Sequence, residues 1–512
     1  GQLTHVVYPA GFAVTYQRNA AGQVSDIGIL QGQQPSAFAT GLTYNPFGPL
    51  KSLTWANGLT LSRTYDQDYR LTQQSVGPWQ ANYGYDANSN IESLQSGLFG
   101  DLFYSYDELD RLTQEEQANL RQQYTYDAVG NRTSKAVTHL GSTPTSTTTT
   151  LGYATNSNRL TQIGSQAVTS DAAGNLTKDR ASRELQYDAQ GRLARVKIGN
   201  DIVAEYRYNA LGQRTHKITS IAVVTFLYGP DGQLLGETRY NSAGTKLSSQ
   251  YYLWLDSMPI GGQALSYSPN GSVSNRTTFY LHADHLNSPR LATNQAGQEI
   301  WRWKSDAFGE GAASVVQGSG IDAINLRFPG QYYDFESGLH YNYFRDYDPQ
   351  TGRYVESDPI GLAGGLNTFG YATGNPIKYA DFLGLTPNTP YDTFARARSE
   401  MLEEIRLKGI ETGNEWTSYI YKIKDNGCVK YAYTELSTNE HPNLVIPQEP
   451  LPGKPPLEHG HNHPGNSDIS DQDILISKEL NVSVSKIGHD GRVQVYDPKI
   501  NWIMTPRHPV TE

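Results

Sequence analysis

The fold is indicated most clearly by two stretches of the sequence, YDELDRLTQ at residues 106–114 and YDAVGNRTS at residues 126–134. Each begins with Tyr-Asp, passes through a short polar turn and continues into a segment that favours strands. Related phrases start at Tyr65, Tyr85, Tyr187, Tyr208 and Tyr228. Within each of two runs, 65, 85, 106, 126 and 187, 208, 228, neighbouring starts lie 20 or 21 residues apart. This period is the length of one hairpin with two strands and two turns, so we expect a stack of hairpins.

Two further features of the repeats indicate what the hairpins build. Asp or Asn followed by Gly supplies the positive backbone angles that tight turns require. Several copies carry a second tyrosine two residues earlier, so that both rings project from one face of a strand. These tyrosines are Tyr83, Tyr104, Tyr124 and Tyr206. We expect a continuous, curling sheet in which the tyrosines pack rather than react; a β-propeller, with about 40 residues per blade, fits this period less well.

Composition excludes several classes of protein. The 512 residues contain 35 Tyr and 49 Gly but 3 Met, and the formal net charge of -10 argues against a general nucleic-acid binder. The single cysteine, Cys428, excludes a disulfide framework and a thiolate zinc cluster. No run of about 18 apolar residues is present, so we expect no membrane span. The chain starts without Met or a signal peptide, and we expect it to be a fragment of a longer protein.

These repeats resemble the YD repeats of the Rhs and teneurin-like family. The resemblance is strongest in YLHADHLNSPRLATNQAGQEIWRWKSDAFG, from Tyr280, and in LRFPGQYYDFESGLHYNYFRDYDPQTGRYVESDPIGLAGGLNTFGYATGNPIKYADFLGL, from Leu326. It covers most of the chain before residue 386. It implies a mainly β protein with a spiral YD-repeat shell over residues 1–279, a core-associated domain over 280–385 and an enclosed toxin domain over 386–512.

Two similar phrases mark the end of this block: DPIGL at residues 358–362 and DFLGL at residues 381–385. In Rhs proteins such a pair forms an aspartyl self-cleavage site. The resemblance therefore implies scission between Leu385 and Thr386. The alternative is that Asp-Pro-x-Gly is simply a turn signal.

The same resemblance assigns residues to the cleavage. Asp358 and Asp381 would share a proton, because two carboxylates brought together cannot both ionise cheaply, and one then serves as acid and the other as base. Arg345 matches a family arginine that is thought to assist. This sequence departs from the family once, since Phe382 stands where Pro is usual.

The character of the sequence changes after Leu385. Apolar spacing predicts an amphipathic helix in YDTFARARSEMLEEIRLKGIETG, and alternation predicts two strands around the Asn426-Gly427 turn. SDISDQDILISKELN, from Ser467, predicts a second helix, and VSVSKIGHDGRVQVYD, from Val482, predicts a final hairpin. We therefore expect a small α+β domain.

The histidine-rich stretch EHGHNHPGNSDISDQD, at residues 458–473, predicts a metal site. His461 and His463 share one side of an extended segment and can both reach one ion. Asp473 falls in the first turn of the predicted helix, where it could supply a third ligand and leave the fourth position to water. That layout is typical of a catalytic zinc site.

This pattern resembles the signature of JAMM (JAB-type) metallopeptidases, although Ser470 lies one residue closer to the second histidine than is usual there. The resemblance implies His461, His463 and Asp473 as zinc ligands, Glu415 as general base and Ser470 as oxyanion donor. Zinc would lower the pKa of its water to about 7. Glu415 would take the proton, and Ser470 would help to stabilise the oxyanion. The implied cargo is a zinc-dependent peptidase or isopeptidase with a protein substrate.

Other interpretations of the tail stay open. The histidines could form only a polar loop, with Ser470 and Asp473 capping a helix. The alternative bases are Glu435, Glu440 and Glu458. A metal-dependent nuclease is the main rival enzyme, although HNH nucleases place those residues far apart and residues 386–512 carry 13 Lys and Arg against 18 Asp and Glu. A zinc deaminase would need a Pro-Cys-x-x-Cys partner, and the chain could also be a non-enzymatic scaffold for adhesion or delivery.

The Rhs resemblance also implies a biological setting. We expect a secreted toxin that is delivered into a target cell, in the manner of type VI secretion. Its expected partners are an immunity protein, a secretion-spike protein and a chaperone. The acidic composition predicts no nucleic-acid partner.

Overall fold

The computed structural model describes residues 3–32, 35–46, 48–229 and 232–385, together with six strands between residues 417 and 504. The chain divides into two compact units, Gly1–Thr386 and Pro387–Glu512. The described residues of the first unit form strands and turns with two short 3-10 helices, which confirms the prediction of a mainly β protein. No helix in the described ranges is long and apolar enough to cross a membrane.

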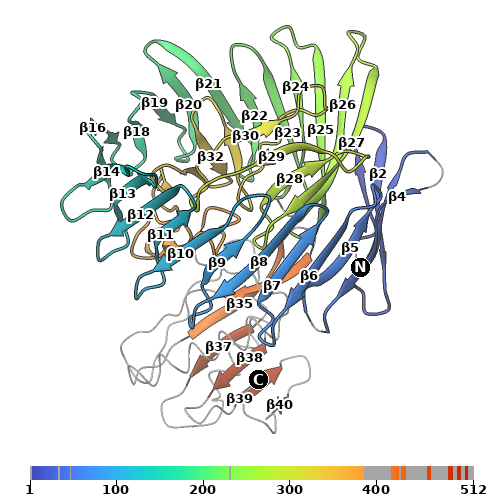
Figure 1. The fold of residues 1–512 in the computed structure, drawn as a ribbon, viewed down its shortest axis with the longest axis horizontal. Helices are drawn as coiled ribbons and strands as arrows, with labels where there is room; N and C mark the ends of the chain where they lie inside the picture. The colour runs from blue at the N-terminus through green and yellow to red at the C-terminus, as the bar shows by residue number, and fades with distance from the viewer. Residues whose placement is uncertain are drawn as a thin grey trace. The chain divides into compact units, whose positions relative to one another are not determined.

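The first sheet has sixteen strands, each hydrogen-bonded to the strand that follows it in sequence (Figure 1). Its neighbouring strands run antiparallel, as a series of hairpins requires. The strands are β1 (His5–Tyr8), β2 (Phe12–Arg18), β3 (Val24–Leu30), β4 (Pro35–Tyr44), β5 (Leu50–Trp55), β6 (Thr60–Tyr65), β7 (Leu71–Val76), β8 (Trp79–Tyr85), β9 (Ile91–Gln95), β10 (Leu102–Tyr106), β11 (Leu112–Gln117), β12 (Leu120–Tyr126), β13 (Arg132–His139), β14 (Thr145–Tyr153), β15 (Leu160–Ile163) and β16 (Gln166–Ala167).

The second sheet continues the same pattern over fourteen strands. The strands are β17 (Thr169–Ser170), β18 (Leu176–Lys178), β19 (Glu184–Tyr187), β20 (Leu193–Ile198), β21 (Asp201–Tyr208), β22 (Arg214–Ile218), β23 (Val223–Tyr228), β24 (Leu234–Tyr240), β25 (Lys246–Leu255), β26 (Met258–Tyr267), β27 (Val273–Ala283), β28 (Pro289–Thr293), β29 (Glu299–Trp303) and β30 (Ala313–Val315). The expected boundary between residues 279 and 280 falls inside β27, so the sheet continues past it.

The Tyr-Asp phrase forms the turn between successive strands, and Asp107 shows why an aspartate is needed there. Its Oδ1 accepts hydrogen bonds of 3.0 Å from the main-chain N–H groups of Leu109 and Arg111, which closes the turn. The fifth residue of the phrase has a positive φ in every copy, whether it is glycine or not. These residues are Tyr69, Ser89, Asp110, Gly130, Gly191, Gly212 and Gly232. The predicted positive backbone angle is therefore confirmed at the glycines, and an aspartate side chain closes the turn in the copies where glycine is missing.

The phrase also joins each hairpin to the next. Arg111 Nε donates a 2.7 Å hydrogen bond to Asp107 Oδ2, and its guanidinium lies 4.9 Å from the ring centre of Tyr126 in the following copy. The Tyr126 hydroxyl in turn donates 2.7 Å back to the carbonyl of Leu112. Each copy thus contributes a tyrosine that packs on the previous one, which confirms a packing role for these rings.

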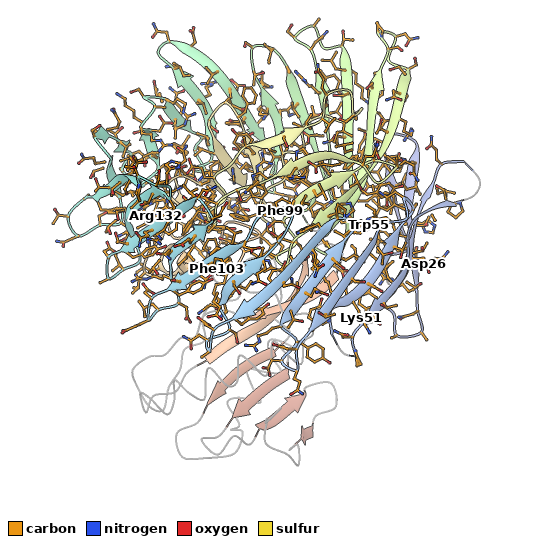
Figure 2. All side chains as sticks on the ribbon, in the orientation of Figure 1. Asp26, Lys51, Trp55, Phe99, Phe103 and Arg132 are labelled. Carbon is orange, nitrogen blue, oxygen red and sulfur yellow. The ribbon has the colours of Figure 1, made fainter. Side chains whose placement is uncertain are left out.

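The two sheets share a core where the start of the first packs on the end of the second. Trp55 in β5, labelled in Figure 2, donates a 2.8 Å hydrogen bond to the carbonyl of Ile260 in β26. The hydroxyl of Tyr8 in β1 donates 2.8 Å to the carbonyl of Tyr252 in β25. Both side chains are buried, so these contacts between distant parts of the sequence are dry and specific.

Apart from β30, residues 304–385 lie outside the two large sheets and pack against both. Phe308 packs on Tyr124 of the first sheet with ring centres 4.8 Å apart, and Leu339 and Val355 join a core with Val196 of the second. This segment contains a four-stranded sheet and the two 3-10 helices. Its elements are β31 (Tyr332–Asp334), β32 (Leu339–Asn342), β33 (Arg345–Asp348), β34 (Arg353–Tyr354), η1 (Gly361–Gly364) and η2 (Ala372–Gly374).

The described part of the second unit is one sheet in the order β36-β35-β37-β38-β39-β40. Its strands are β35 (Thr417–Asp425), β36 (Cys428–Tyr433), β37 (Glu458–Asn462), β38 (Ser483–Ile487), β39 (Val493–Asp497) and β40 (Trp502–Met504). The antiparallel pairs β35–β36 and β38–β39 confirm the two predicted hairpins. The two predicted helices lie outside the described residues, so the expected α+β character is not shown.

Candidate self-cleavage site

Three segments bring the predicted self-cleavage residues together. Arg345 begins β33, Asp358 lies in the loop after β34, and Asp381 lies close to the end of the first unit. All three are buried, with exposed fractions of 1%, 5% and 4%. The trio is therefore assembled in the folded chain, although 36 residues separate Arg345 from Asp381.

One guanidinium nitrogen of Arg345 faces both carboxylates. Nη2 lies 2.9 Å from Asp358 Oδ2 and 3.4 Å from Asp381 Oδ2. The longer contact is aligned as a hydrogen bond, whereas Asp358 Oδ2 accepts no hydrogen bond from any described residue. A shared cation offsets the repulsion that would otherwise keep two buried carboxyl groups apart.

The main chain of the DFLGL phrase contacts the same charged side chains. The main-chain N–H of Leu385 donates a 2.9 Å hydrogen bond to Asp381 Oδ1, and Arg345 Nε donates 2.5 Å to the carbonyl of Gly384. A Cβ on Gly384 would lie 2.6 Å from the carbonyl oxygen of Asn342, and its φ is +69°. Only glycine fits at this position. The bond at which scission is predicted begins at Leu385 and ends at Thr386, which lies outside the described residues.

Two hydrogen bonds fix the position of Asp358, the first residue of the DPIGL phrase. Asp358 Oδ1 accepts a 3.0 Å hydrogen bond from the main-chain N–H of Ile360, and the Asp358 N–H donates 2.7 Å to the carbonyl of Thr368. Burial raises the pKa of Asp358 to about 6, against the lowering effect of Arg345 and with a further increase from Asp381. The site therefore favours the protonated form of Asp358 more than water does.

Sequence reasoning missed two polar residues at this centre. The hydroxyl of Tyr354 in β34 donates a 2.9 Å hydrogen bond to Asp381 Oδ2, and its ring centre lies 3.7 Å from Arg345 Cζ. Asn342 Nδ2 donates to the Tyr354 hydroxyl at 2.7 Å and to the main-chain carbonyl of Asp381 at 2.8 Å. Neither residue stands out in the sequence, because each lies in a tyrosine-rich strand like many others.

A second buried carboxyl pair adjoins the site. The main-chain N–H of Asp346 donates 2.7 Å to Glu356 Oε2, and both residues are buried. Burial is the main cause that raises the pKa of Asp346 to about 7, and burial followed by the charge of Asp346 raises the pKa of Glu356. Asp346 follows Arg345 directly, and Glu356 precedes Asp358 by two residues. The pair thus ties together the two segments that supply the site.

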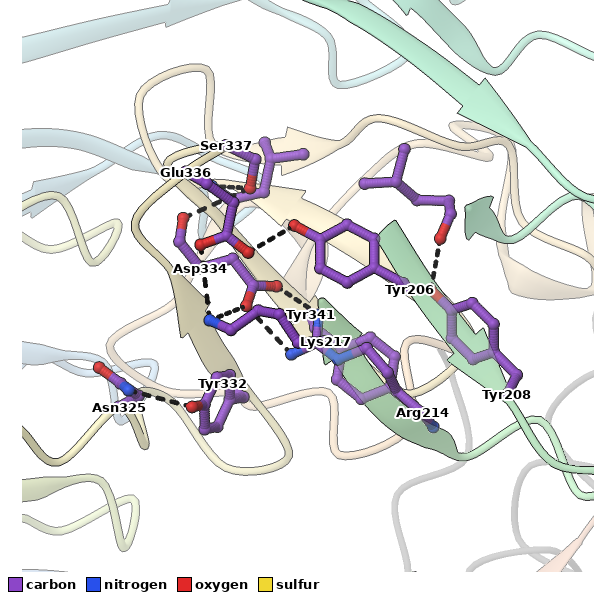
Figure 3. A network of polar contacts seen from close by, with 12 residues as sticks. Tyr206, Tyr208, Arg214, Lys217, Asn325, Tyr332, Asp334, Glu336, Ser337 and Tyr341 are labelled. Carbon is purple, nitrogen blue, oxygen red and sulfur yellow. Dashed lines mark hydrogen bonds and ion pairs between the residues drawn. The ribbon is translucent and has the colours of Figure 1, made fainter. Parts of the chain in front are cut away.

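A buried polar network anchors β31 to the second sheet (Figure 3). Asp334 forms hydrogen-bonded ion pairs with Arg214 and, at 3.0 Å, with Lys217, both from β22. The Tyr206 hydroxyl donates 2.8 Å to Glu336 Oε1. Arg214 and Asp334 each have a side-chain exposure of 1%, so their charges have only each other and these neighbours as partners in place of water.

The predicted zinc site falls mostly outside the described residues. Among its residues only His461 lies in a described strand, β37, where the backbone pairs it with Thr417 of β35. The predicted residues outside the described part are Glu415, His463, Ser470 and Asp473. Within the described part of the chain, no group of three or more His, Cys, Asp or Glu residues is placed to hold a metal ion.

Comparison with protein families matches residues 84–363 to the family described as Teneurin YD-shell. The chain is 29% identical over 272 residues to "Double-stranded DNA deaminase toxin A" of Burkholderia cenocepacia (strain H111), a match that covers 42% of this chain and 19% of that protein. It is 28% identical over 203 residues to "Probable deoxyribonuclease RhsA" of Dickeya dadantii (strain 3937), covering 40% of this chain and 14% of that protein. The chain thus spans less than a fifth of the length of either relative.

A solved structure shares the fold of the first unit. The TcdB2-TccC3-TEV crystal structure matches 75% of this chain and 21% of its own, with a TM-score of 0.65 and 21% sequence identity. The similarity at this identity concerns the fold alone. The relative named RhsA supports the resemblance of the shell to Rhs proteins.

Proposed function

The chain belongs to the Teneurin YD-shell family, and from this premise we propose that it is the shell and cargo of an Rhs-type toxin that cuts its own backbone between Leu385 and Thr386. The observation that supports the cut is the position of Arg345 Nη2 within 3.4 Å of both Asp358 and Asp381. Two carboxyl groups that share one buried site can divide the roles of general acid and general base. Water then hydrolyses the peptide bond.

The local geometry holds the peptide that precedes the proposed cut. Asp381 contacts the N–H of Leu385, and Arg345 contacts the carbonyl of Gly384, so the peptide that precedes the proposed cut is held against the acid pair. Because the reacting groups are held in place within one chain, the entropic cost of bringing them together is already met by folding. The same contacts explain why cleavage would need no second molecule of the protein.

The test is the size of the product. Wild-type chain should give two bands on a denaturing gel, of 385 and 127 residues (512 minus 385). Asp358→Asn and Asp381→Asn should each give one band of full length. Asp201→Asn, at an exposed position in β21, is the matched control and should be cut like wild type. A single uncut band from wild type would show that the chain does not cleave itself.

For the released segment 386–512 we propose a toxic enzyme that acts on nucleic acid. Both relatives named above are described as acting on DNA, one as a deaminase and one as a deoxyribonuclease. The family match ends at residue 363, and the segment carries more acidic than basic residues. Degradation or base conversion of plasmid DNA in cells that express the segment would support this activity.

A zinc-dependent peptidase is the second candidate for the segment. The observation that favours it is the register of β35 and β37, which sets His461 opposite Thr417. In the sequence, His463 and Glu415 each lie two residues beyond this pair. His461, His463 and Asp473 would hold the zinc, Glu415 would move the proton and Ser470 would stabilise the oxyanion. Bound zinc, intact plasmid DNA and loss of toxicity in Glu415→Ala would favour this enzyme over a nuclease.

We further propose the partners of a delivered toxin. The segment would require an immunity protein in the producing cell, and a chaperone and a secretion-spike protein would carry the chain into its target. The proposed shell would retain the cut segment until delivery. Accordingly, the two pieces should co-elute in native buffer and separate only after denaturation.

A further inference from the structure

The two aspartates of the candidate site have different surroundings. Asp381 accepts hydrogen bonds at both oxygens, from the Tyr354 hydroxyl, the Leu385 N–H and Arg345 Nη2. Asp358 accepts one hydrogen bond, from the Ile360 N–H, and Arg345 approaches its other oxygen without hydrogen-bond alignment. Donors stabilise the ionised carboxylate, and burial without donors stabilises the neutral acid.

Tyr354 has the geometry to enforce this difference. Asn342 Nδ2 donates to its hydroxyl oxygen, so the hydroxyl proton is left to point at Asp381. The orientation of the Asn342 amide is fixed, because its nitrogen also contacts the carbonyl of Asp381, which can only accept. Burial raises the pKa of Tyr354 well above its usual value, so the hydroxyl remains a donor through the acid and neutral range.

We propose that Tyr354 is a positioning residue whose hydrogen bond to Asp381 makes this aspartate the general base of self-cleavage, which leaves Asp358 as the general acid. The inference rests on the proposed self-cleavage and assigns the two roles within it. It goes beyond the acid pair itself, because two carboxyl groups in one site do not by themselves determine which holds the proton.

Bonds and protons are conserved in the assigned hydrolysis step. Asp381 takes a proton from a water molecule as the water oxygen bonds to the carbonyl carbon of Leu385. Asp358 gives its proton to the nitrogen of Thr386 as the carbon–nitrogen bond breaks. The products are a carboxyl group on Leu385 and an amine on Thr386, with the proton moved from Asp358 to Asp381. Exchange with solvent restores the starting state.

Among the described residues, charged and titratable groups face Asp381 from at least four places. They are Arg345 in β33, Tyr354 in β34, Asp358 in the following loop and Tyr371 at the start of η2. Burial raises the pKa of Tyr371, and the charge of Asp381 raises it further, so this phenol stays neutral in the acid range. Loss of the Tyr354 hydroxyl removes one hydrogen-bond donor from Asp381 Oδ2.

The experiment is the pH dependence of cleavage in the full chain. The chain is synthesised without cells near pH 8, where a deprotonated Asp358 slows the cut, and is then shifted to buffers between about pH 3.5 and 8. The rate of appearance of the 385-residue product gives a bell-shaped profile. Its acid limb reports the base and its alkaline limb reports the acid.

Tyr354→Phe keeps the ring beneath Arg345 and removes the donor. The acid limb should move up by about one pH unit, with about a tenfold lower rate below it and no shift of the alkaline limb. Tyr347→Phe is the matched control, because this equally buried hydroxyl donates to the carbonyl of Phe308 and not to an aspartate. Its profile should equal that of wild type.

A second variant keeps the test independent of folding defects. Replacement of Tyr354 by 3,5-difluorotyrosine strengthens the donor, so the acid limb should move down instead of up. Movement of the alkaline limb, or limbs that stay in place in both variants, would overturn the assignment while the cut in wild type upheld the proposed function. Absence of any cut in wild type would instead overturn the proposed function.

Discussion

The main-chain N–H of Asp346 donates a 2.7 Å hydrogen bond to the side chain of Glu356, deep inside the first unit. This contact joins β33, which carries Arg345, to the segment that leads into Asp358. Both carboxyl groups are surrounded by protein, and burial raises the pKa of each. The site therefore adjoins a second pair of buried acids.

The first prediction concerns the stability of this region against pH. The pKa of Asp346 is raised to about 7 in the folded chain, above its value in the unfolded chain. The folded state then holds the proton more tightly than the unfolded state. Protonation of Asp346 therefore stabilises the fold fully below about pH 4, and this stabilisation is lost as the pH rises through 7. Asp346→Asn mimics the neutral form. It should reduce the slope of the unfolding free energy against pH by up to about 1.4 kcal/mol per pH unit. Melting temperatures between about pH 4 and 8 measure it.

The control for this prediction is Glu92→Gln, at an exposed position in β9. It should leave the slope unchanged. An Asp346→Asn chain whose melting temperature falls with pH as steeply as that of wild type would contradict the raised pKa.

The second prediction concerns the buried network of Figure 3. Asp334→Asn leaves Arg214 without its carboxylate in a buried site, while Lys217 keeps its contact with Glu336 at 3.5 Å. The free energy of unfolding should fall by about 3–5 kcal/mol, because an uncompensated buried charge loses its partner but does not regain water. Denaturant titration measures the loss. Glu116→Gln breaks a half-exposed pair with Arg121 and should cost at most about 1 kcal/mol; equal losses would contradict the distinction.

The third prediction separates the charge of Arg345 from its shape. Arg345→Lys keeps one positive charge but cannot reach both aspartates, Gly384 and Thr368 at once. Self-cleavage should slow by about a hundredfold or more, which a time course on denaturing gels shows. Arg195→Lys, at a half-exposed position, should cut at the wild-type rate. Near-normal cutting by Arg345→Lys would mean that only its charge matters.

The fourth prediction concerns the backbone next to the proposed cut. Gly384→Ala places a Cβ 2.6 Å from the carbonyl oxygen of Asn342 at a φ of +69°. The loop must shift, and we expect cleavage to fall below detection while the shell stays folded. Gly244→Ala is a control with a similar φ of +79° and no atom within 4 Å of the added carbon. It should cost stability of about 1 kcal/mol but leave cleavage intact.

Much of the first unit could be predicted because its contacts repeat. Asp107 closes its own turn, Arg111 pairs with it, and Tyr126 lies one period further along, so every partner is near in sequence. Local partners leave a period in the sequence that can be seen without the structure. Arg345, Asp358 and Asp381 were identified from the family resemblance, and the folded chain does bring them together.

The hairpin period, the turn chemistry and the two phrases that end the shell can all be recognised in the printed sequence. Only the folded chain reveals that Asn342 and Tyr354 contact Asp381, that Asp346 lies against Glu356 and that Arg214 pairs with Asp334. The physical reason is that these pairs are made by short strands and loops that pack without a period. Burial then changes the ionisation of groups that look ordinary in the sequence.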